Sequence, residues 1–223
     1  MKKILTIAHR GASAYAPENT LTAFKKAMEL GADFIELDVQ ATKDSEVVVF
    51  HDEAFKNGKT LSQMYVDGVR EEGLIHGIDI PLLSEVIETL SARIGLNIEV
   101  KTEGAAPLLV PLLQTCSEHG IILSSLNEAV LRELKEAFPR IMLGGISDTE
   151  LTDPLAFLGR VNADILIQHV DFLNPDHIEL IHSEMKRLFV WTVNNPGEIR
   201  RMIHYGVDGI ITDYPDRVVS YLS

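Results

Sequence analysis

The stretch Phe34-Ile35-Glu36-Leu37-Asp38-Val39 places two acidic side chains inside an otherwise apolar run. Successive residues of a β-strand point to opposite faces, so Glu36 and Asp38 share one face while their apolar neighbours share the other. The run Leu96–Lys101 repeats this pattern with Glu99. Buried charges cost on the order of several kcal/mol each unless something compensates them. A divalent cation and an anionic substrate would compensate, so this pattern predicts an enzyme.

Working outward from these runs, short apolar segments alternate with amphipathic segments along the whole chain. The sequence predicts strands at Ile4–Ala8, Phe34–Ala41 with Val47–Phe50, Leu96–Val100, Ile121–Ser124, Met142–Gly145, Ile165–Ile167, Leu188–Val193 and Gly209–Thr212. It predicts helices at Leu21–Leu30, Leu83–Ala92, Ala106–Glu118, Glu128–Ala137, Pro154–Val161, Asp176–Lys186, Glu198–Tyr205 and Arg217–Leu222.

This alternation of strands and helices indicates an α/β fold, the (β/α)8 TIM barrel. A doubly wound open sheet is the rival fold, but its glycine-rich first turn is absent from the sequence. We expect residues 1–223 to form a single catalytic domain with a short insertion after the second strand, at about 52–81. We expect no regular structure in this insertion, which would lie at the carboxyl-terminal mouth, where barrel active sites form.

The overall charge limits the classes of partner. The 223 residues carry a formal charge of −13, which argues against binding to nucleic acid or to an anionic membrane surface. The sequence contains no run of 18 apolar residues, so it predicts no membrane span. The single cysteine, Cys116, excludes a disulfide framework and fits a reducing compartment. The first apolar run is too short for a signal peptide and lacks its cleavage site, so we expect a cytoplasmic protein. The oligomeric state is not readable from the sequence.

Three carboxylates from two neighbouring strands suit a hard cation such as Ca²⁺ or Mg²⁺. Glu36, Asp38 and Glu99 are therefore the candidate ligands of one divalent cation. The alternative interpretation is a set of buried ion pairs that these carboxylates form with Arg10 and Lys101.

Two histidines follow strand ends that should reach the same mouth. His9 follows the first strand and His51 follows the extension of the second, so the two imidazoles are candidates for general acid and general base. Arg10 and Lys101 supply local positive charge that could hold a phosphate. Trp191, the only tryptophan, could pack against the carbon skeleton of a substrate. Weaker candidates at the same rim are Glu18, His169, Asn194 and Asp213.

Taken in order, these motifs resemble the glycerophosphodiester phosphodiesterase family over essentially the whole chain. The matching segments are His9-Arg10-Gly11, Pro17-Glu18-Asn19-Thr20, Glu36-Leu37-Asp38-Val39, His51-Asp52, Glu99-Val100-Lys101, Trp191-Thr192-Val193-Asn194 and Asp208-Gly209-Ile210-Ile211-Thr212-Asp213. Each motif alone is weak, but their order and their positions at predicted strand ends are specific.

The resemblance implies a (β/α)8 barrel that hydrolyses glycerophosphodiesters to glycerol 3-phosphate and an alcohol. It implies a Ca²⁺ or Mg²⁺ ion at Glu36, Asp38 and Glu99. It also implies acid–base roles for His9 and His51, and substrate contacts for the three residues Arg10, Lys101 and Trp191. The chain departs from the family after His51-Asp52, because the usual Arg-Thr-Thr run is missing and the insertion is short, which bears on substrate choice.

Two other functions remain open from the sequence. One is a lyase-type phospholipase, similar to phosphatidylinositol-specific phospholipase C or sphingomyelinase D, whose mark would be an accumulating cyclic phosphate. The other is a barrel that binds phosphate or metal without catalysis, whose mark would be the loss of one catalytic residue, and none is lost here.

Overall fold

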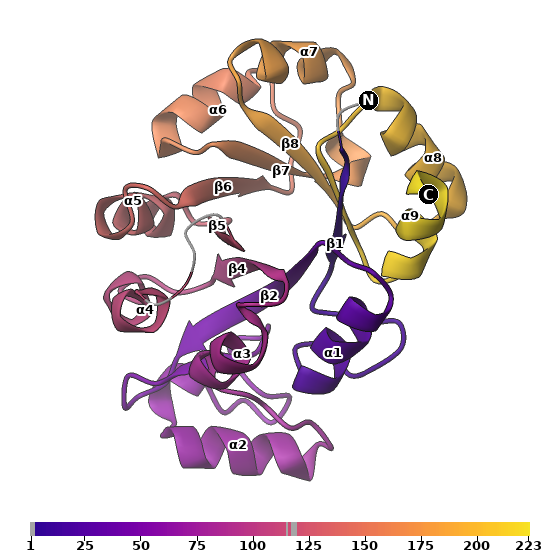
Figure 1. Cartoon of the computed structure of the whole chain (residues 1–223). Coiled ribbons are helices and arrows are strands. Elements are labelled where there is room, and N and C mark those ends of the chain that lie inside the picture. The colour runs from indigo at the N-terminus through magenta and orange to yellow at the C-terminus, as the bar shows by residue number, and fades with distance from the viewer. Residues whose placement is uncertain (1–2, 115, 117–119) are drawn as a thin grey trace.

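A closed ring of parallel strands surrounded by helices forms the body of the protein in this computed structural model, which describes residues 3–114, 116 and 120–223 (Figure 1). Within those residues the parallel strands are β1 Leu5–Ala8, β2 Phe34–Ala41, β4 Gly95–Val100, β5 Ile121–Ser125, β6 Met142–Ser147, β7 Ile165–His169, β8 Arg187–Trp191 and β9 Gly209–Thr212. β1 pairs with both β2 and β9, which closes the barrel and confirms the predicted fold class.

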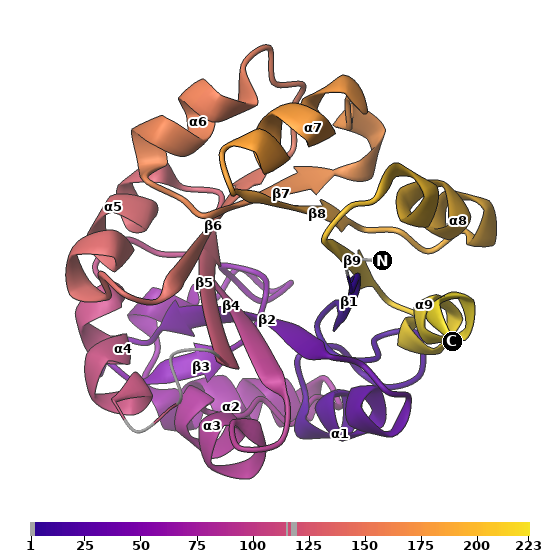
Figure 2. The ribbon, with the colours of Figure 1, turned by 45° about the horizontal axis from the view of Figure 1, so that its top comes forward.

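The helices cover the outside of the ring, as the tilted view shows (Figure 2). Their bounds are α1 Leu21–Glu29, α3 Leu83–Leu90, α4 Ala106–Leu113, α5 Glu128–Ala137, α6 Pro154–Val161, α7 Asp176–Ser183, α8 Pro196–Tyr205 and α9 Pro215–Leu222. Thr20 and Asn127 cap α1 and α5 by accepting hydrogen bonds from the backbone N–H groups of Ala23 and Ala129. The last predicted turn of the helix at 106–118 reaches beyond the described residues.

Two separate apolar layers follow from the strand alternation. Inside the ring, Ile7, Ile122, Ile165, Ile167 and Phe189 belong to one buried cluster. A larger cluster lies between the strands and the surrounding helices. Burial of both layers provides the main stabilisation of the barrel, and it leaves the polar residues of β2 and β4 to line one side of the interior.

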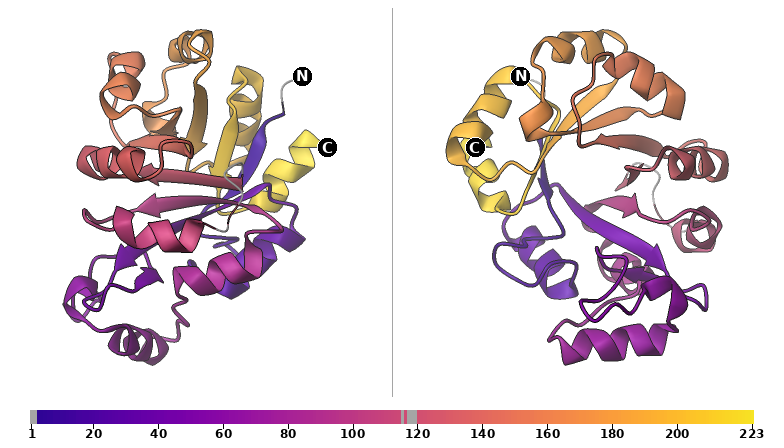
Figure 3. Two further views of the ribbon diagram at one scale, coloured as in Figure 1. Left: turned by 60° about the vertical axis from the view of Figure 1, so that its left-hand side comes forward. Right: turned by 180° about the vertical axis from the view of Figure 1, so that it is seen from behind.

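The insertion is more ordered than the sequence indicated. The prediction of irregular structure over 52–81 is wrong, because this segment contains a 3-10 turn at Leu61–Gln63 and the helix α2, Val66–Ile75. It follows β3, Val47–Val49, which pairs antiparallel with β2. A small apolar cluster of Val48, Phe55, Leu61, Val69 and Ile80 holds the insertion together. In the figures α2 lies outside the helical ring, beyond α3 (Figures 1 and 3).

No helix among the described residues is both long and apolar enough to cross a bilayer. The two ends of the chain lie on the same side of the molecule (Figure 3). Lys3 and Ile4 line the same groove as Leu222 and Ser223. Because parallel strands all direct their carboxyl ends to one face, this groove lies at the opposite face, where β1 begins.

Candidate active site

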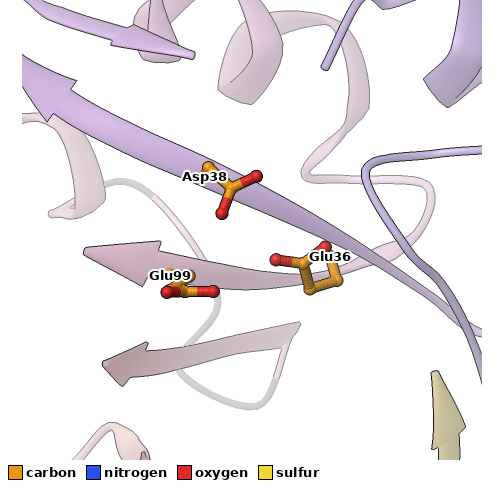
Figure 4. A group of neighbouring side chains, drawn as sticks. All are labelled: Glu36, Asp38 and Glu99. Carbon is orange, nitrogen blue, oxygen red and sulfur yellow. The ribbon is translucent and has the colours of Figure 1, made fainter. Parts of the chain in front are cut away.

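Three carboxylates gather at the mouth of the barrel from two adjacent strands (Figure 4). In the register of β2 and β4, Asp38 lies opposite Glu99 and Glu36 lies opposite Asn97. The three residues are buried, and one ligand atom from each of Glu36, Asp38 and Glu99 lies within 4.8 Å of the others. Alternation along a strand therefore brings the predicted acidic residues together.

Burial and mutual repulsion raise the pKa of Glu36 to about 8. Burial also raises the pKa of Asp38, but the positive charges of Lys101 and Arg10 outweigh it and hold that pKa below its usual value. Burial raises the pKa of Glu99, although Lys101 opposes the shift. Such a set of oxygen donors, with one member holding a proton near neutral pH, fits a divalent cation that would replace the proton.

Two positive side chains approach the carboxylates. Lys101 Nζ lies 2.8 Å from Asp38 Oδ1 and 2.5 Å from Glu99 Oε1. Arg10 Nε lies 3.3 Å from Asp38 Oδ2, while Arg10 Nη1 donates to Glu18 Oε1 at 2.9 Å. The ion pairs of the alternative interpretation are therefore present, with two cations facing three carboxylates. Glu18, a weaker candidate from the sequence, thus contacts Arg10 directly.

The backbone at Arg10 is itself part of the site. Arg10 has φ +54°, an uncommon value for a residue other than glycine, and its N–H donates to Glu36 Oε2 at 2.8 Å. Gly11 follows with φ +82° and lies against the backbone of Ala23 in α1. The His9-Arg10-Gly11 motif thus folds the chain back so that one backbone N–H reaches a carboxylate.

His9 is held by a hydrogen-bond network around Asp213, which directly follows β9. Its Nδ1 lies 2.7 Å from Asp213 Oδ1, and Asp213 also accepts hydrogen bonds from Ser13 Oγ at 2.9 Å and Asn194 Nδ2 at 2.6 Å. Burial lowers the pKa of His9, but the bond to Asp213 and the charge of Glu36 outweigh it, and the pKa rises above its usual 6.5. With Nδ1 engaged, Nε2 is the ring atom left for the pocket.

The side chain of His51 is held less firmly than that of His9. Its Nδ1 lies 2.7 Å from Asp52 Oδ1, but the Asp52 side chain is 63% exposed. Both histidines line one pocket together with Glu36, Glu99, Lys101 and Trp191.

Trp191 also contacts a further histidine at the rim. The centroid of its ring lies 5.0 Å from that of His169 in an edge-on arrangement.

The pocket brings together most of the residues singled out from the sequence, namely His9, Arg10, Glu36, His51, Glu99, Lys101 and Trp191, and Asp38 lies against Lys101 beside them. The weaker candidates Glu18, His169, Asn194 and Asp213 are not part of its lining. The roles of the individual residues stay predictions. Sequence reasoning missed Asn19, which is buried and binds Asp38 twice: Nδ2 donates to Asp38 Oδ2 at 2.8 Å, and Oδ1 accepts from the Asp38 N–H at 3.2 Å. In the sequence, Asn19 stood out only as part of the Pro17-Glu18-Asn19-Thr20 motif, and Asp213 only as a weaker rim candidate. Both contacts join residues far apart in sequence, so no local pattern marks them.

The fold and the site define a TIM-barrel protein with three buried carboxylates at its mouth and two histidines in the same pocket. The sequence model of the glycerophosphoryl diester phosphodiesterase family matches residues 9–217. The chain belongs to this family.

Individual relatives agree with the family assignment. The chain is 38% identical to the glycerophosphodiester phosphodiesterase of Caldanaerobacter subterraneus subsp. tengcongensis, over 98% of this chain and 97% of the relative. It is similar to the solved glycerophosphodiester phosphodiesterase of Thermotoga maritima, with TM-score 0.85, 30% identity and 99% coverage of each chain. An Oleispira antarctica phosphodiesterase, solved with the product sn-glycerol-3-phosphate, gives TM-score 0.88 and 26% identity over 96% of this chain and 94% of that one.

Proposed function

We propose that this chain hydrolyses glycerophosphodiesters to glycerol 3-phosphate and an alcohol, with one divalent cation, Ca²⁺ or Mg²⁺, at Glu36, Asp38 and Glu99. The observation that carries the proposal is the meeting of these three carboxylates within 4.8 Å at the barrel mouth, in a pocket that two histidines share. Membership of the family and the product bound by the Oleispira antarctica relative support the same reaction.

The cation would bind through carboxylate oxygens, which are the ligands that Ca²⁺ and Mg²⁺ prefer. When bound, it polarises the phosphate oxygens and offsets the negative charge that develops during hydrolysis. Arg10 and Lys101 add positive charge on the same side of the pocket and hold the phosphate. The ring of Trp191 packs against the carbon skeleton of the substrate.

The two imidazoles move the protons of the reaction. One removes a proton from the nucleophilic hydroxyl, and the other donates a proton to the oxygen of the departing alcohol as its bond to phosphorus breaks. In both His9 and His51 a carboxylate occupies Nδ1, which leaves Nε2 for transfer. The nucleophile is either water or the neighbouring hydroxyl of the glycerol, and the second route forms a cyclic phosphate that water then opens.

A coupled assay for glycerol 3-phosphate over a panel of deacylated phospholipids tests the reaction. We expect turnover with added Ca²⁺ or Mg²⁺ and none with a chelator. Alanine at His9 or His51 should reduce kcat by about 10²- to 10⁴-fold, as loss of a general acid or base does. Alanine at the exposed His204 on α8 is the control and should leave kcat unchanged.

Wild-type rates in both variants would refute the catalytic roles of the histidines. An accumulating cyclic phosphate with no glycerol 3-phosphate would replace the proposed reaction with that of a lyase. Ligand binding without any turnover in the presence of the cation would indicate a non-catalytic barrel.

The remaining features of the proposal rest on composition. The net charge of −13 favours a small-molecule substrate over nucleic acid. The single cysteine favours a reducing, cytoplasmic setting.

A further inference from the structure

A buried amide lies at the mouth end of β2, beyond the acidic residues. Gln40 follows Glu36 and Asp38 on the same face of the strand, and only 2% of it is exposed. Its Nε2 lies 3.0 Å from the carbonyl oxygen of Phe50, 3.1 Å from that of His51 and 2.7 Å from that of Asp52. One amide group with two N–H bonds thus serves three successive carbonyl groups.

These three carbonyl groups belong to the segment that carries His51. β3 ends at Val49, and residues 50–52 lie in no strand or helix. The exposed Asp52 restrains the His51 ring only weakly, because an exposed ion pair contributes little. His9 differs, since Asp213 holds its ring and is itself fixed by further hydrogen bonds.

We propose that Gln40 is a positioning residue that sets the place of His51 in the mouth by holding the backbone on both sides of it; the inference rests on the proposed function. Removing the amide leaves these partly buried carbonyl groups without this donor and frees the segment to move. A misplacement of about 1 Å can cost about 10²-fold in rate. Because His51 acts in the chemical step, the loss falls on kcat rather than on KM.

The chain offers a matched control. Gln168 on β7 is likewise buried, and its Nε2 donates to the carbonyl groups of Ser147 at 3.3 Å and Thr149 at 3.0 Å. This second clamp holds the segment after β6, which carries none of the proposed catalytic or binding residues. Gln40→Met and Gln168→Met therefore remove the same kind of hydrogen bond and differ in what the held segment carries.

The experiment measures kcat and KM for glycerophosphocholine hydrolysis, with the activating cation present, and the melting temperature of each variant. We expect Gln40→Met to lower kcat by about 10- to 100-fold with KM changed by less than about threefold. Gln168→Met should keep kcat within about twofold of wild type. If Gln40→Met does not fold, Gln40→Leu removes the same amide with a smaller side chain and without burying a charge, and it carries the same expectation.

A double variant separates positioning from general structural damage. If Gln40 acts through His51, adding Gln40→Met to His51→Ala should cost less than about twofold more, because the two changes are coupled. A further loss as large as in the wild-type background would overturn the inference, and so would wild-type kcat in Gln40→Met. These outcomes are read only against an active wild-type enzyme, so an inactive wild type would refute the proposed function instead.

Discussion

At the residue scale, the site is built from charges that would be unfavourable alone. Glu36, Asp38 and Glu99 face one another in a buried mouth, and Lys101 and Arg10 lie against Asp38. The positive charges hold the pKa of Asp38 down, while Glu36 keeps a raised pKa of about 8. Unequal environments therefore give chemically identical groups different protonation at the same pH.

The pair of His9 and Asp213 should make stability depend on pH. Burial raises the pKa of Asp213, but the bond to His9 outweighs it and the pKa falls below 3.8. The contribution of Asp213 is therefore present above 3.8 and is lost as pH falls through its lowered folded value. The contribution of His9 is complete below 6.5 and is lost as pH rises through its raised folded value.

We therefore expect Asp213→Asn to reduce the free energy of unfolding most between about pH 4 and 6.5, by about 1.5 to 3 kcal/mol, the range for hydrogen bonds to charged groups. The loss should shrink above the raised pKa of His9. Urea unfolding of the cation-free protein over this pH range measures it. Asp171→Asn is the control, because that exposed carboxylate lies 3.9 Å from His169. A loss that does not change with pH would contradict the expectation.

Part of the site was readable in the sequence because strand alternation is a local rule. The direction of each acidic side chain follows from its position within its own strand, as for Glu36, Asp38 and Glu99. His9 and His51 follow strand ends, which places them at one rim of the barrel. Asn19, Gln40 and Asp213 were not readable as partners of these residues. Their contacts depend on how loops return to the mouth, which sequence periodicity does not encode.

At the element scale, the first loop depends on a close approach to α1. A Cβ on Gly11 would lie 2.7 Å from the carbonyl carbon of Ala23, and Gly11 has φ +82°. Gly58 has a similar φ of +83°, but no atom lies within 4 Å of its would-be Cβ. A side chain at Gly58 would therefore meet only backbone strain, whereas one at Gly11 would meet the same strain and a steric clash with α1.

We expect Gly58→Ala to lower the free energy of unfolding by about 1 kcal/mol, from backbone strain alone. Gly11→Ala should lower it by about 2 to 4 kcal/mol, because overpacking adds to the same strain. Thermal and urea unfolding of the two variants check this ordering. Equal losses in both variants would mean that contact with α1 adds nothing.

The insertion shows where element prediction fails. Helix α2 contains Gly68 and Gly73, which lower helix propensity, and only Val69, Glu72 and Gly73 are buried in it. Glu72 forms an ion pair with Lys59, which joins α2 to the preceding loop, and it also lies 3.4 Å from His76 Nε2 at the end of the helix. A helix stabilised by such tertiary contacts lacks the amphipathic pattern that revealed most of the other helices.

At the scale of the whole molecule, folding pairs β2 with β4 and so brings three repelling carboxylates together in a buried mouth. Their repulsion opposes folding, and a cation that binds only the folded protein relieves it. Ion binding and global stability should therefore be linked.

We expect saturating Ca²⁺ or Mg²⁺, at about a hundred times its Kd, to stabilise the protein by about 2.7 kcal/mol. For a domain of this size that raises Tm by about 5 to 10 °C. The control is the triple variant Glu36→Gln, Asp38→Asn and Glu99→Gln, which should show no shift on adding the ion. Differential scanning calorimetry measures both, and an equal shift in the control would place the ion elsewhere.

The meeting of Lys3 and Ile4 with Leu222 and Ser223, on the face away from the mouth, has a practical consequence. A short peptide bridge could join the two termini, and new ends could then be opened in a surface loop without breaking any strand pairing. The same geometry allows immobilisation through either terminus with the catalytic opening turned toward solution.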